Sequence, residues 1–221
     1  MEKTAILLGA TGLTGSLLLD LLLEDERYKT IKVFTRTPLA FKHPKIVNFT
    51  GDVIALERFE NDFTGDEVFC CIGTTAKKTP DRQMYRQIDY GIPVKAAELC
   101  KKNKIPTFVV VSALGADAQS SIYYSRTKGE MEEAVLGIKL KDTYILRPSL
   151  IIGNRKEKRM AESLASSFFK IAAPIMTGPL KKYAPNKATD IAKAMLAVAN
   201  DKPPKIFILA EDIEAVANHK F

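Results

Sequence analysis

Histidine and cysteine are scarce in this chain, which has two histidines and three cysteines in 221 residues. Cys70 and Cys71 are adjacent, so the cysteines do not show the paired spacing of a disulfide-rich protein. His43 and His219 stand far apart, and no cluster of cysteine and histidine has the spacing of metal ligands. The sequence therefore predicts neither a disulfide framework nor a bound metal.

Long apolar runs are also missing. Asp20 interrupts the leucines after Gly15, and Lys170 interrupts a later apolar stretch, so no segment reaches the roughly 18 residues that a membrane span needs. The apolar run near the N-terminus is cut by glycines and lacks the cleavage pattern of a signal peptide. We therefore expect a cytoplasmic protein without a transmembrane segment.

Acidic residues are fewer than basic ones, 26 against 33, and the net charge is +7. A basic excess can attract nucleic acid or an anionic membrane. The basic residues are scattered in short groups, however, mostly at the ends of expected elements, where such side chains are usually just solvated. We therefore expect no dedicated nucleic-acid binding. With 46% hydrophobic residues, the chain is expected to form a single domain over residues 1–221.

A glycine-rich turn near the N-terminus is the most informative stretch. Thr4–Leu8 is a short apolar run, typical of a strand buried on both faces of a parallel sheet. Gly9, Gly12 and Gly15 follow in the spacing GxxGxxG and lead into a leucine-rich helix. Such glycines allow a tight exit from the strand, close approach to a pyrophosphate, and close packing of helix on strand. Free N–H groups at the helix start favour a bound dianion. An ordinary flexible loop is the alternative, which the flanking elements disfavour.

The end of the second expected strand bears on the choice of dinucleotide. A turn of this kind that prefers NAD usually has an acidic residue roughly 20 positions after the glycines. Thr35 stands there instead, and Arg36 beside it offers a positive group to a 2′-phosphate. We therefore predict NADP(H) in preference to NAD(H), with an ordinary surface arginine as the alternative. Asp52 and Val53, at the end of a third strand, are candidates to flank an adenine, although a turn-forming aspartate is equally consistent with the sequence.

Strands and helices are expected to alternate along the chain. Further strands are expected over residues 66–75, 105–113, 142–153 and 204–210, with helices over 55–62, 84–103, 123–136 and 188–200. This order predicts an α/β fold of Rossmann type, a doubly wound parallel sheet with right-handed crossovers. Pro93 is expected to kink its helix, because its ring removes an N–H and displaces the carbonyl of Asp89.

Residues 151–186 depart from the regular alternation and are the candidate cover for a substrate. We expect a helix over residues 155–173 inside this segment, ended by Pro174. The apolar stretch at residues 164–176 exceeds what such a helix needs for itself, so it could instead form a contact with a protein or a membrane surface.

Three residues combine into a candidate site for proton transfer. Tyr124 and Lys128 are four apart on one expected helix, so they share a face. Ser112 ends the preceding strand, at the sheet edge where ligands of open α/β folds bind. The pKa of a phenol, ordinarily about 10, would be lowered by a nearby ammonium and by a nicotinium charge. Ser112 would then orient a carbonyl or alcohol, and Tyr124 would exchange the proton as hydride moves to or from a nicotinamide.

Several motifs resemble a known family. GATGLTG at the start, SALGAD after the fifth strand, YSRTK on the following helix and LRPSLIIG after the sixth strand resemble a short-chain dehydrogenase/reductase of the atypical or extended type. More narrowly, CIGTT, IDYG and YSRTKGEMEE resemble the small oxidoreductase-like family named for binding the viral Tat protein. The resemblance covers nearly the whole chain, and its motifs are more specific for fold and cofactor than for a reaction.

The resemblance implies a role for each matching position. Ser112, Tyr124 and Lys128 would form the catalytic triad, and Tyr124 and Lys128 would also contact the cofactor. The pyrophosphate would be held by Gly9, Thr11, Gly12, Leu13, Thr14 and Gly15, the 2′-phosphate by Arg36, the adenine by Asp52 and Val53, the ribose by Ile72, Gly73 and Thr74, and the nicotinamide by the backbone of Pro148, Ser149 and Leu150.

Two functions are compatible with these observations. The first is an NADP(H)-dependent oxidoreductase acting on a small carbonyl or alcohol. The second is a regulatory or scaffold protein that binds the cofactor, catalyses little, and signals its occupancy to a protein partner through residues 151–186. The retained triad favours catalysis. The short substrate region favours regulation, as does Asp89, which stands where many active relatives have asparagine, and both features argue against a sugar-nucleotide epimerase. We expect a monomer or a homodimer.

Overall fold

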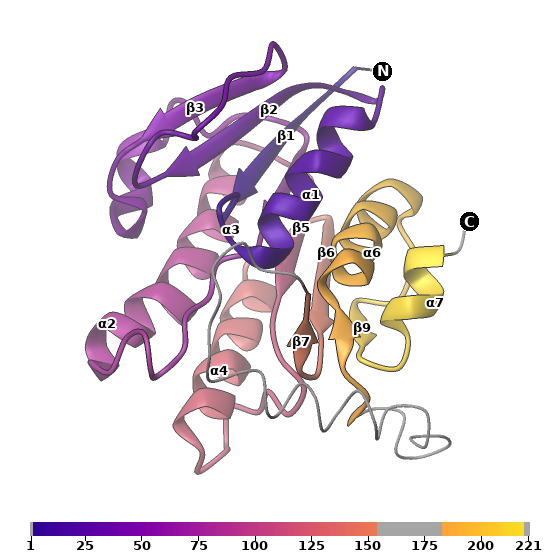
Figure 1. The fold of residues 1–221 in the computed structure, drawn as a ribbon. Coiled ribbons are helices and arrows are strands. Elements are labelled where there is room, and N and C mark those ends of the chain that lie inside the picture. The colour runs from indigo at the N-terminus through magenta and orange to yellow at the C-terminus, as the bar shows by residue number, and fades with distance from the viewer. Residues whose placement is uncertain (1, 154–182, 219–221) are drawn as a thin grey trace.

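A seven-stranded parallel sheet forms the centre of the molecule, in a computed structural model that describes residues 2–153 and 183–218 (Figure 1). The strands follow one another across the sheet in the order β3-β2-β1-β4-β5-β6-β9, and each neighbouring pair is parallel. Their bounds are β1 (Lys3–Leu8), β2 (Tyr28–Thr35), β3 (Ile46–Thr50), β4 (Glu67–Cys70), β5 (Thr107–Val111), β6 (Asp142–Arg147) and β9 (Phe207–Leu209). The predicted Rossmann-type fold is confirmed.

The first strand is buried on both faces from Ala5 to Leu8, as the uncharged run Thr4–Leu8 predicts. Ala5 and Leu7 belong to the core on one face of the sheet, and Ile6 and Leu8 belong to the core on the other. All four are fully excluded from solvent. Such a strand needs helices on both sides, because removing apolar surface from water stabilises the fold by roughly 25 cal/mol per Å².

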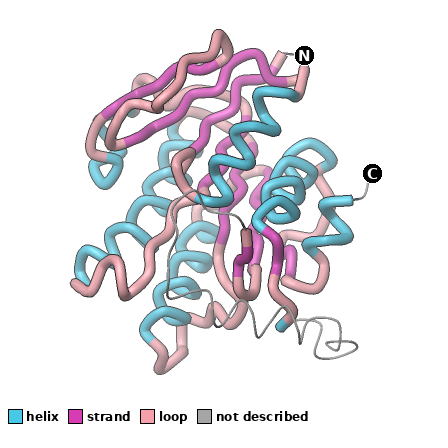
Figure 2. Tube along the Cα trace, viewed as in Figure 1, coloured by secondary structure: helices cyan, strands magenta, loops and turns pink. Residues whose placement is uncertain are grey.

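Helices cover both faces of the sheet and give the molecule three layers (Figures 1 and 2). The core on one face is completed by α1 (Leu13–Glu24), α6 (Ala188–Asp201) and α7 (Ile213–Asn218). The core on the other face is completed by η1 (Val53–Phe59), α3 (Ile92–Lys102) and α4 (Tyr123–Gly137). The helix expected over residues 55–62 is therefore η1, a 3-10 helix that begins and ends earlier.

The helix expected over residues 84–103 is divided by a π turn. In the structure α2 (Arg82–Arg86) passes into η2 (Gln87–Gly91), which follows the wider π pattern, and α3 then begins at Ile92. Pro93 has no N–H to donate, and its ring excludes the carbonyl of Asp89, four residues earlier. The π turn takes one extra residue into the helix at this point, which accommodates the proline ring. It also places Asp89 where none of its surface is exposed.

A small second sheet joins the two ends of the segment over residues 151–186. β7 (Ile151–Ile152) pairs in parallel with β8 (Asn186–Lys187), so the two ends of the segment lie side by side. The helix expected over residues 155–173 and the apolar stretch at 164–176 lie outside the described residues. Among the helices that the structure does describe, none has the length and apolar character to cross a membrane.

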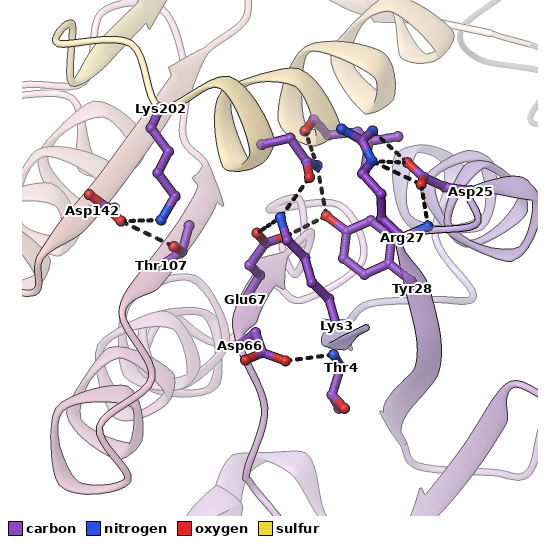
Figure 3. A network of polar contacts seen from close by, with 12 residues as sticks. Lys3, Thr4, Asp25, Arg27, Tyr28, Asp66, Glu67, Thr107, Asp142 and Lys202 are labelled. Atoms are coloured by element: carbon purple, nitrogen blue, oxygen red, sulfur yellow. Dashed lines mark hydrogen bonds and ion pairs between the residues drawn. The ribbon is translucent and has the colours of Figure 1, made fainter. Parts of the chain in front are cut away.

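A polar network joins the amino ends of the strands, at the edge opposite the glycine-rich turn (Figure 3). The carboxylate of Glu67, only 2% exposed, accepts from Lys3 Nζ at 2.6 Å and from the Tyr28 hydroxyl. Asn200 Nδ2 donates to the same hydroxyl at 2.8 Å, which ties α6 to the sheet. Because the buried carboxylate is paired, the network connects β1, β2 and β4 without leaving an isolated charge in the core.

Candidate cofactor site and active site

A cavity of about 650 Å³ opens at the carboxyl ends of β1, β4, β5 and β6. Its walls come from the loops that follow these strands, from α4 and from the start of α1. The residues with a predicted role that line it are Gly12, Leu13, Thr14, Ile72, Gly73, Thr74, Ser112, Tyr124, Lys128, Pro148, Ser149 and Leu150. Positions spread over more than half of the chain therefore meet at the edge where open α/β sheets bind ligands.

The glycine-rich turn approaches its neighbours too closely for side chains. Gly9 has a φ of +86°, and a Cβ added there would lie 2.9 Å from the carbonyl carbon of Cys71. A Cβ added to Gly15 would lie 2.0 Å from the carbonyl oxygen of Gly9, so α1 packs directly on the strand exit. Gly12 is the N-cap of α1, and no side chain of the described residues caps the helix. The first N–H groups of α1 are thus left to a ligand, which fits a pyrophosphate.

Gly129 fixes the position of α4 against the loop that follows β5. A Cβ at Gly129 would lie 2.1 Å from the backbone nitrogen of Ala118, so helix and loop are in backbone contact. The Asp117 N–H donates to the carbonyl of Ser125 at 3.0 Å. These contacts turn the face of α4 that carries Tyr124 toward the cavity. Gly129 carries no prediction from the sequence, although a glycine inside a helix often marks close packing.

Ser112 presents a buried hydroxyl that has no hydrogen-bond partner among the residues the structure describes. The residue is 4% exposed, and its N–H donates to the carbonyl of Leu146 at 2.7 Å, which continues the ladder between β5 and β6. Its Oγ has no hydrogen-bond partner within the described part of the chain, yet the residue lines the cavity. A buried hydroxyl without a partner is costly unless a ligand or water satisfies it. Ser112 is therefore suited to bind an oxygen of a ligand.

Lys128 forms an ion pair with Asp89, the residue that departs from the asparagine of many relatives. Its Nζ lies 2.9 Å from Asp89 Oδ1. Burial opposes the lysine's charge, but the neighbouring Asp89 and Tyr124 outweigh it, so the pKa of Lys128 is raised. Lys128 is therefore an ammonium ion although it is only 4% exposed.

The phenol of Tyr124 is not activated in the protein alone. Burial raises its pKa, Lys128 lowers it, and Asp89 raises it again, with a net increase above the usual value. The ammonium of Lys128 thus lowers the pKa of Tyr124 as expected, but the two opposing contributions together are larger. The side chain lines the cavity and keeps 43% of its surface exposed, so a ligand can reach it.

The other predicted cofactor contacts lie outside the cavity lining. Gly9 and Gly15 are occupied in packing, as described above, and Thr11 lies exposed within the same turn. Arg36 is exposed directly after β2, and Asp52 and Val53 follow β3. Asp52 Oδ1 accepts from the N–H of Ile54 at 3.0 Å and caps η1, so its turn-forming role is present. These positions share the carboxyl edge of the sheet with the glycine-rich turn, because β1, β2 and β3 are parallel neighbours.

Fold and site together define a Rossmann-type NAD(P)H-binding protein. The chain matches the family model described as NAD(P)H-binding over residues 9–170, and it belongs to that family. It is 33% identical over 172 residues to Protein HTATIP2 of Rattus norvegicus, covering 76% of this chain and 71% of the relative. It is 28% identical over 232 residues to the mitochondrial protein FMP52 of Candida albicans, covering 97% and 98%. Within its family the chain is thus grouped with the atypical short-chain dehydrogenases/reductases, as the motifs predict.

Solved structures share the fold at low sequence identity. The enzyme WbmH of Bordetella bronchiseptica, in complex with NAD+, has a TM-score of 0.71 at 16% identity over 94% of this chain and 75% of its own. A UDP-N-acetylglucosamine 4-epimerase of Methanobrevibacter ruminantium has a TM-score of 0.71 at 17% identity, with the same coverage. At this identity the comparison shows the fold alone.

Proposed function

We propose that this protein is an NADP(H)-dependent oxidoreductase that acts on a small carbonyl or alcohol. The observation that carries the proposal is the meeting of Gly12, Ser112 and Tyr124 in one cavity. A nucleotide held at the glycine-rich turn and a substrate held by the serine would then lie within reach of the same tyrosine.

Each side chain has a separate task in this proposal. The N–H groups at the start of α1 bind the pyrophosphate, because no side chain in the described part of the protein caps them. Ser112 Oγ, which has no hydrogen-bond partner within residues 2–153 and 183–218, donates to the substrate oxygen. Tyr124 gives or takes the proton at that oxygen, and the Lys128 ammonium favours the phenolate and binds ribose hydroxyls. The bound nicotinamide would supply or accept the hydride.

Turnover of a carbonyl panel with NADPH tests this proposal. Tyr124→Phe removes the proton donor and leaves the ring, so the rate should fall by about a hundredfold or more while NADPH binding persists. Tyr123→Phe is the matched control, because the Tyr123 hydroxyl donates to the carbonyl of Arg82 at 2.8 Å and the residue does not line the cavity. Equal rates for the wild type and Tyr124→Phe, on a compound that the protein does reduce, would refute the assigned role.

The preference for NADP(H) rests on Arg36. Its side chain is exposed after β2, where it is free to reach a 2′-phosphate. A charge-assisted hydrogen bond is worth about 1.5–3 kcal/mol, so Arg36→Ala should weaken NADPH binding by about tenfold or more and leave NADH binding unchanged. Arg58→Ala, an exposed arginine at the end of η1, is the control. Equal losses for both dinucleotides would show that Arg36 does not read the phosphate.

A second candidate function is that of a cofactor-dependent regulator. Ser149, a residue of the cavity wall, donates its N–H to Asn186 Oδ1 at 2.9 Å, and Asn186 belongs to β8 at the end of the segment over residues 151–186. A nucleotide that contacts the backbone near Ser149 would act on this segment directly. The phenol of Tyr124, whose pKa is raised, also favours weak catalysis. NADPH binding without turnover of any carbonyl, combined with altered protease cleavage within 154–182, would support this function.

The cellular compartment, the oligomeric state and the single-domain assignment stay predictions. We expect a cytoplasmic protein, whereas the FMP52 relatives carry the word mitochondrial in their names. Fractionation of cells that express the chain at its natural level tests this expectation. Light scattering distinguishes the predicted monomer from the homodimer.

A further inference from the structure

The carboxylate of Asp89 connects three separate elements, through a hydrogen bond at Oδ2 and an ion pair at Oδ1, which has no hydrogen-bond partner among the described residues. Oδ1 lies 2.9 Å from Nζ of Lys128 on α4, and Oδ2 accepts from the backbone N–H of Thr74 at 2.8 Å. Asp89 itself belongs to the π turn η2 and has no exposed surface. Gly73 lies against the pair, since a Cβ added there would be 3.4 Å from Oδ1 and 3.8 Å from the lysine Nζ. The carboxylate therefore joins helix α4 to the loop that follows β4.

The titratable groups around the ion pair of Asp89 and Lys128 come from four elements. Lys128 and Tyr124 face one another on α4, one helical turn apart. Asp89 faces both of them from η2, Tyr85 adds a buried hydroxyl from α2, and the thiol of Cys70 faces Lys128 from β4. Tyr85 and Cys70 are neutral, because burial raises the pKa of each, that of Cys70 to about 11. Asp89 and Lys128 thus carry opposite charges whose effects on Tyr124 oppose each other.

We propose that Asp89 is a positioning residue of this site: its carboxylate holds the Lys128 ammonium against the loop after β4 and opposes the effect of that positive charge on Tyr124, one helical turn away. The proposal rests on the proposed function, in which Tyr124 exchanges a proton with the substrate oxygen. It distinguishes this chain from a site with asparagine at the same position, where the lysine charge would act on the phenol unopposed. The carboxylate of Asp89 therefore links the position of the loop after β4 to the position of Lys128.

Titration of Tyr124 in the protein without cofactor tests the proposal. Ring-labelled tyrosine is followed by NMR against pH, and the Tyr124 signal is assigned by its absence from Tyr124→Phe. Asp89→Asn keeps the shape and the acceptor for Thr74 but removes the charge. We expect the phenolate fraction at a fixed pH below the midpoint to rise by about tenfold, the effect of one charge within about 6 Å. Asp81→Asn, the exposed N-cap of α2, is the matched control and should leave the titration unchanged.

A second pair of variants covers the case in which Asp89→Asn does not fold, because an unpaired buried lysine is destabilising. The double variant Lys128→Met with Asp89→Asn removes both charges, so neither is left buried without its partner. Its Tyr124 midpoint should lie at a lower pH than that of Lys128→Met alone, since the remaining carboxylate is removed. An unchanged midpoint in either comparison, in folded protein, overturns the proposal, as does an equal shift in Asp81→Asn.

The link to the loop has its own readout. Amide hydrogen exchange at Thr74 should be unchanged in Asp89→Asn, which retains an acceptor, and about fivefold or more faster in Asp89→Leu, which does not. Neither measurement involves cofactor or turnover. If the titration shift is observed but the protein reduces no carbonyl, the role of Asp89 stands and the proposed oxidoreductase function is refuted. If the protein reduces a carbonyl but shows no shift, the function stands and the role of Asp89 is refuted.

Discussion

Replacing Gly15 by alanine should destabilise the protein, although alanine is the better helix former. The added Cβ would lie 2.0 Å from the carbonyl oxygen and 2.7 Å from the carbonyl carbon of Gly9. Both are backbone atoms, so no rotamer change relieves the clash, and the cost lies near the upper end of about 1–3 kcal/mol for overpacking. Removal of a helical glycine returns about 1 kcal/mol. The net loss of about 2 kcal/mol corresponds to a Tm lower by about 4–8 °C in a chain of this length.

Gly137→Ala is the matched control for this prediction. Gly137 ends α4, and a Cβ added there would meet nothing within 4 Å. The same substitution should therefore raise the free energy of unfolding by up to about 1 kcal/mol. Urea unfolding with equal m values measures both variants, and NADPH titration shows whether the turn also loses affinity. A Gly15→Ala variant as stable as Gly137→Ala would refute the inference that α1 packs in backbone contact with the strand exit.

Three further predictions concern stability. Tyr28→Phe should cost about 1–3 kcal/mol in urea unfolding, because Glu67 loses a donor. Burial raises the pKa of Tyr28 far above its usual value, so the wild type should lose stability as pH rises beyond about 10, where only the unfolded chain deprotonates, and the variant should lose less. Gly129→Ala should lower Tm by several degrees through the 2.1 Å contact with Ala118, as calorimetry would show. Arg27 lowers the pKa of Asp25, so the wild type should lose stability as the pH falls through that pKa. Asp25→Asn should lose less, and the free energy of unfolding measured against pH in the acid range tests this.

The elements that the sequence predicted best depend on local patterns. The strand Thr4–Leu8 and its glycine-rich turn were recognisable because a buried parallel strand is uncharged and the glycine spacing is short-range. The shared face of Tyr124 and Lys128 follows from helical periodicity alone. Ser112 was recognisable because carboxyl ends of parallel strands meet at one edge, and the structure brings it to the cavity with the other two.

The π turn and the contacts made by Asp89 were outside the reach of such patterns. Pro93 signals a disturbance in the helix, but the residues around it do not tell which form the disturbance takes. The structure has a π turn there, packed against α4. Asp89 and Lys128 are far apart in the sequence, and no local rule pairs them. The net direction of the Tyr124 pKa in the protein without cofactor also lies beyond local patterns, because burial and the Asp89 charge are properties of the assembled site.

By itself, the sequence determined the order of strands and helices, the backbone turn for a pyrophosphate, and the residue types available for proton transfer, because these depend on neighbours a few positions apart. The tertiary structure alone decided which of those residues share a cavity, how deeply each charge is buried, and which carboxylate meets the lysine. Burial and charge pairing arise from segments distant in the chain, so the chemistry of this site belongs to the fold.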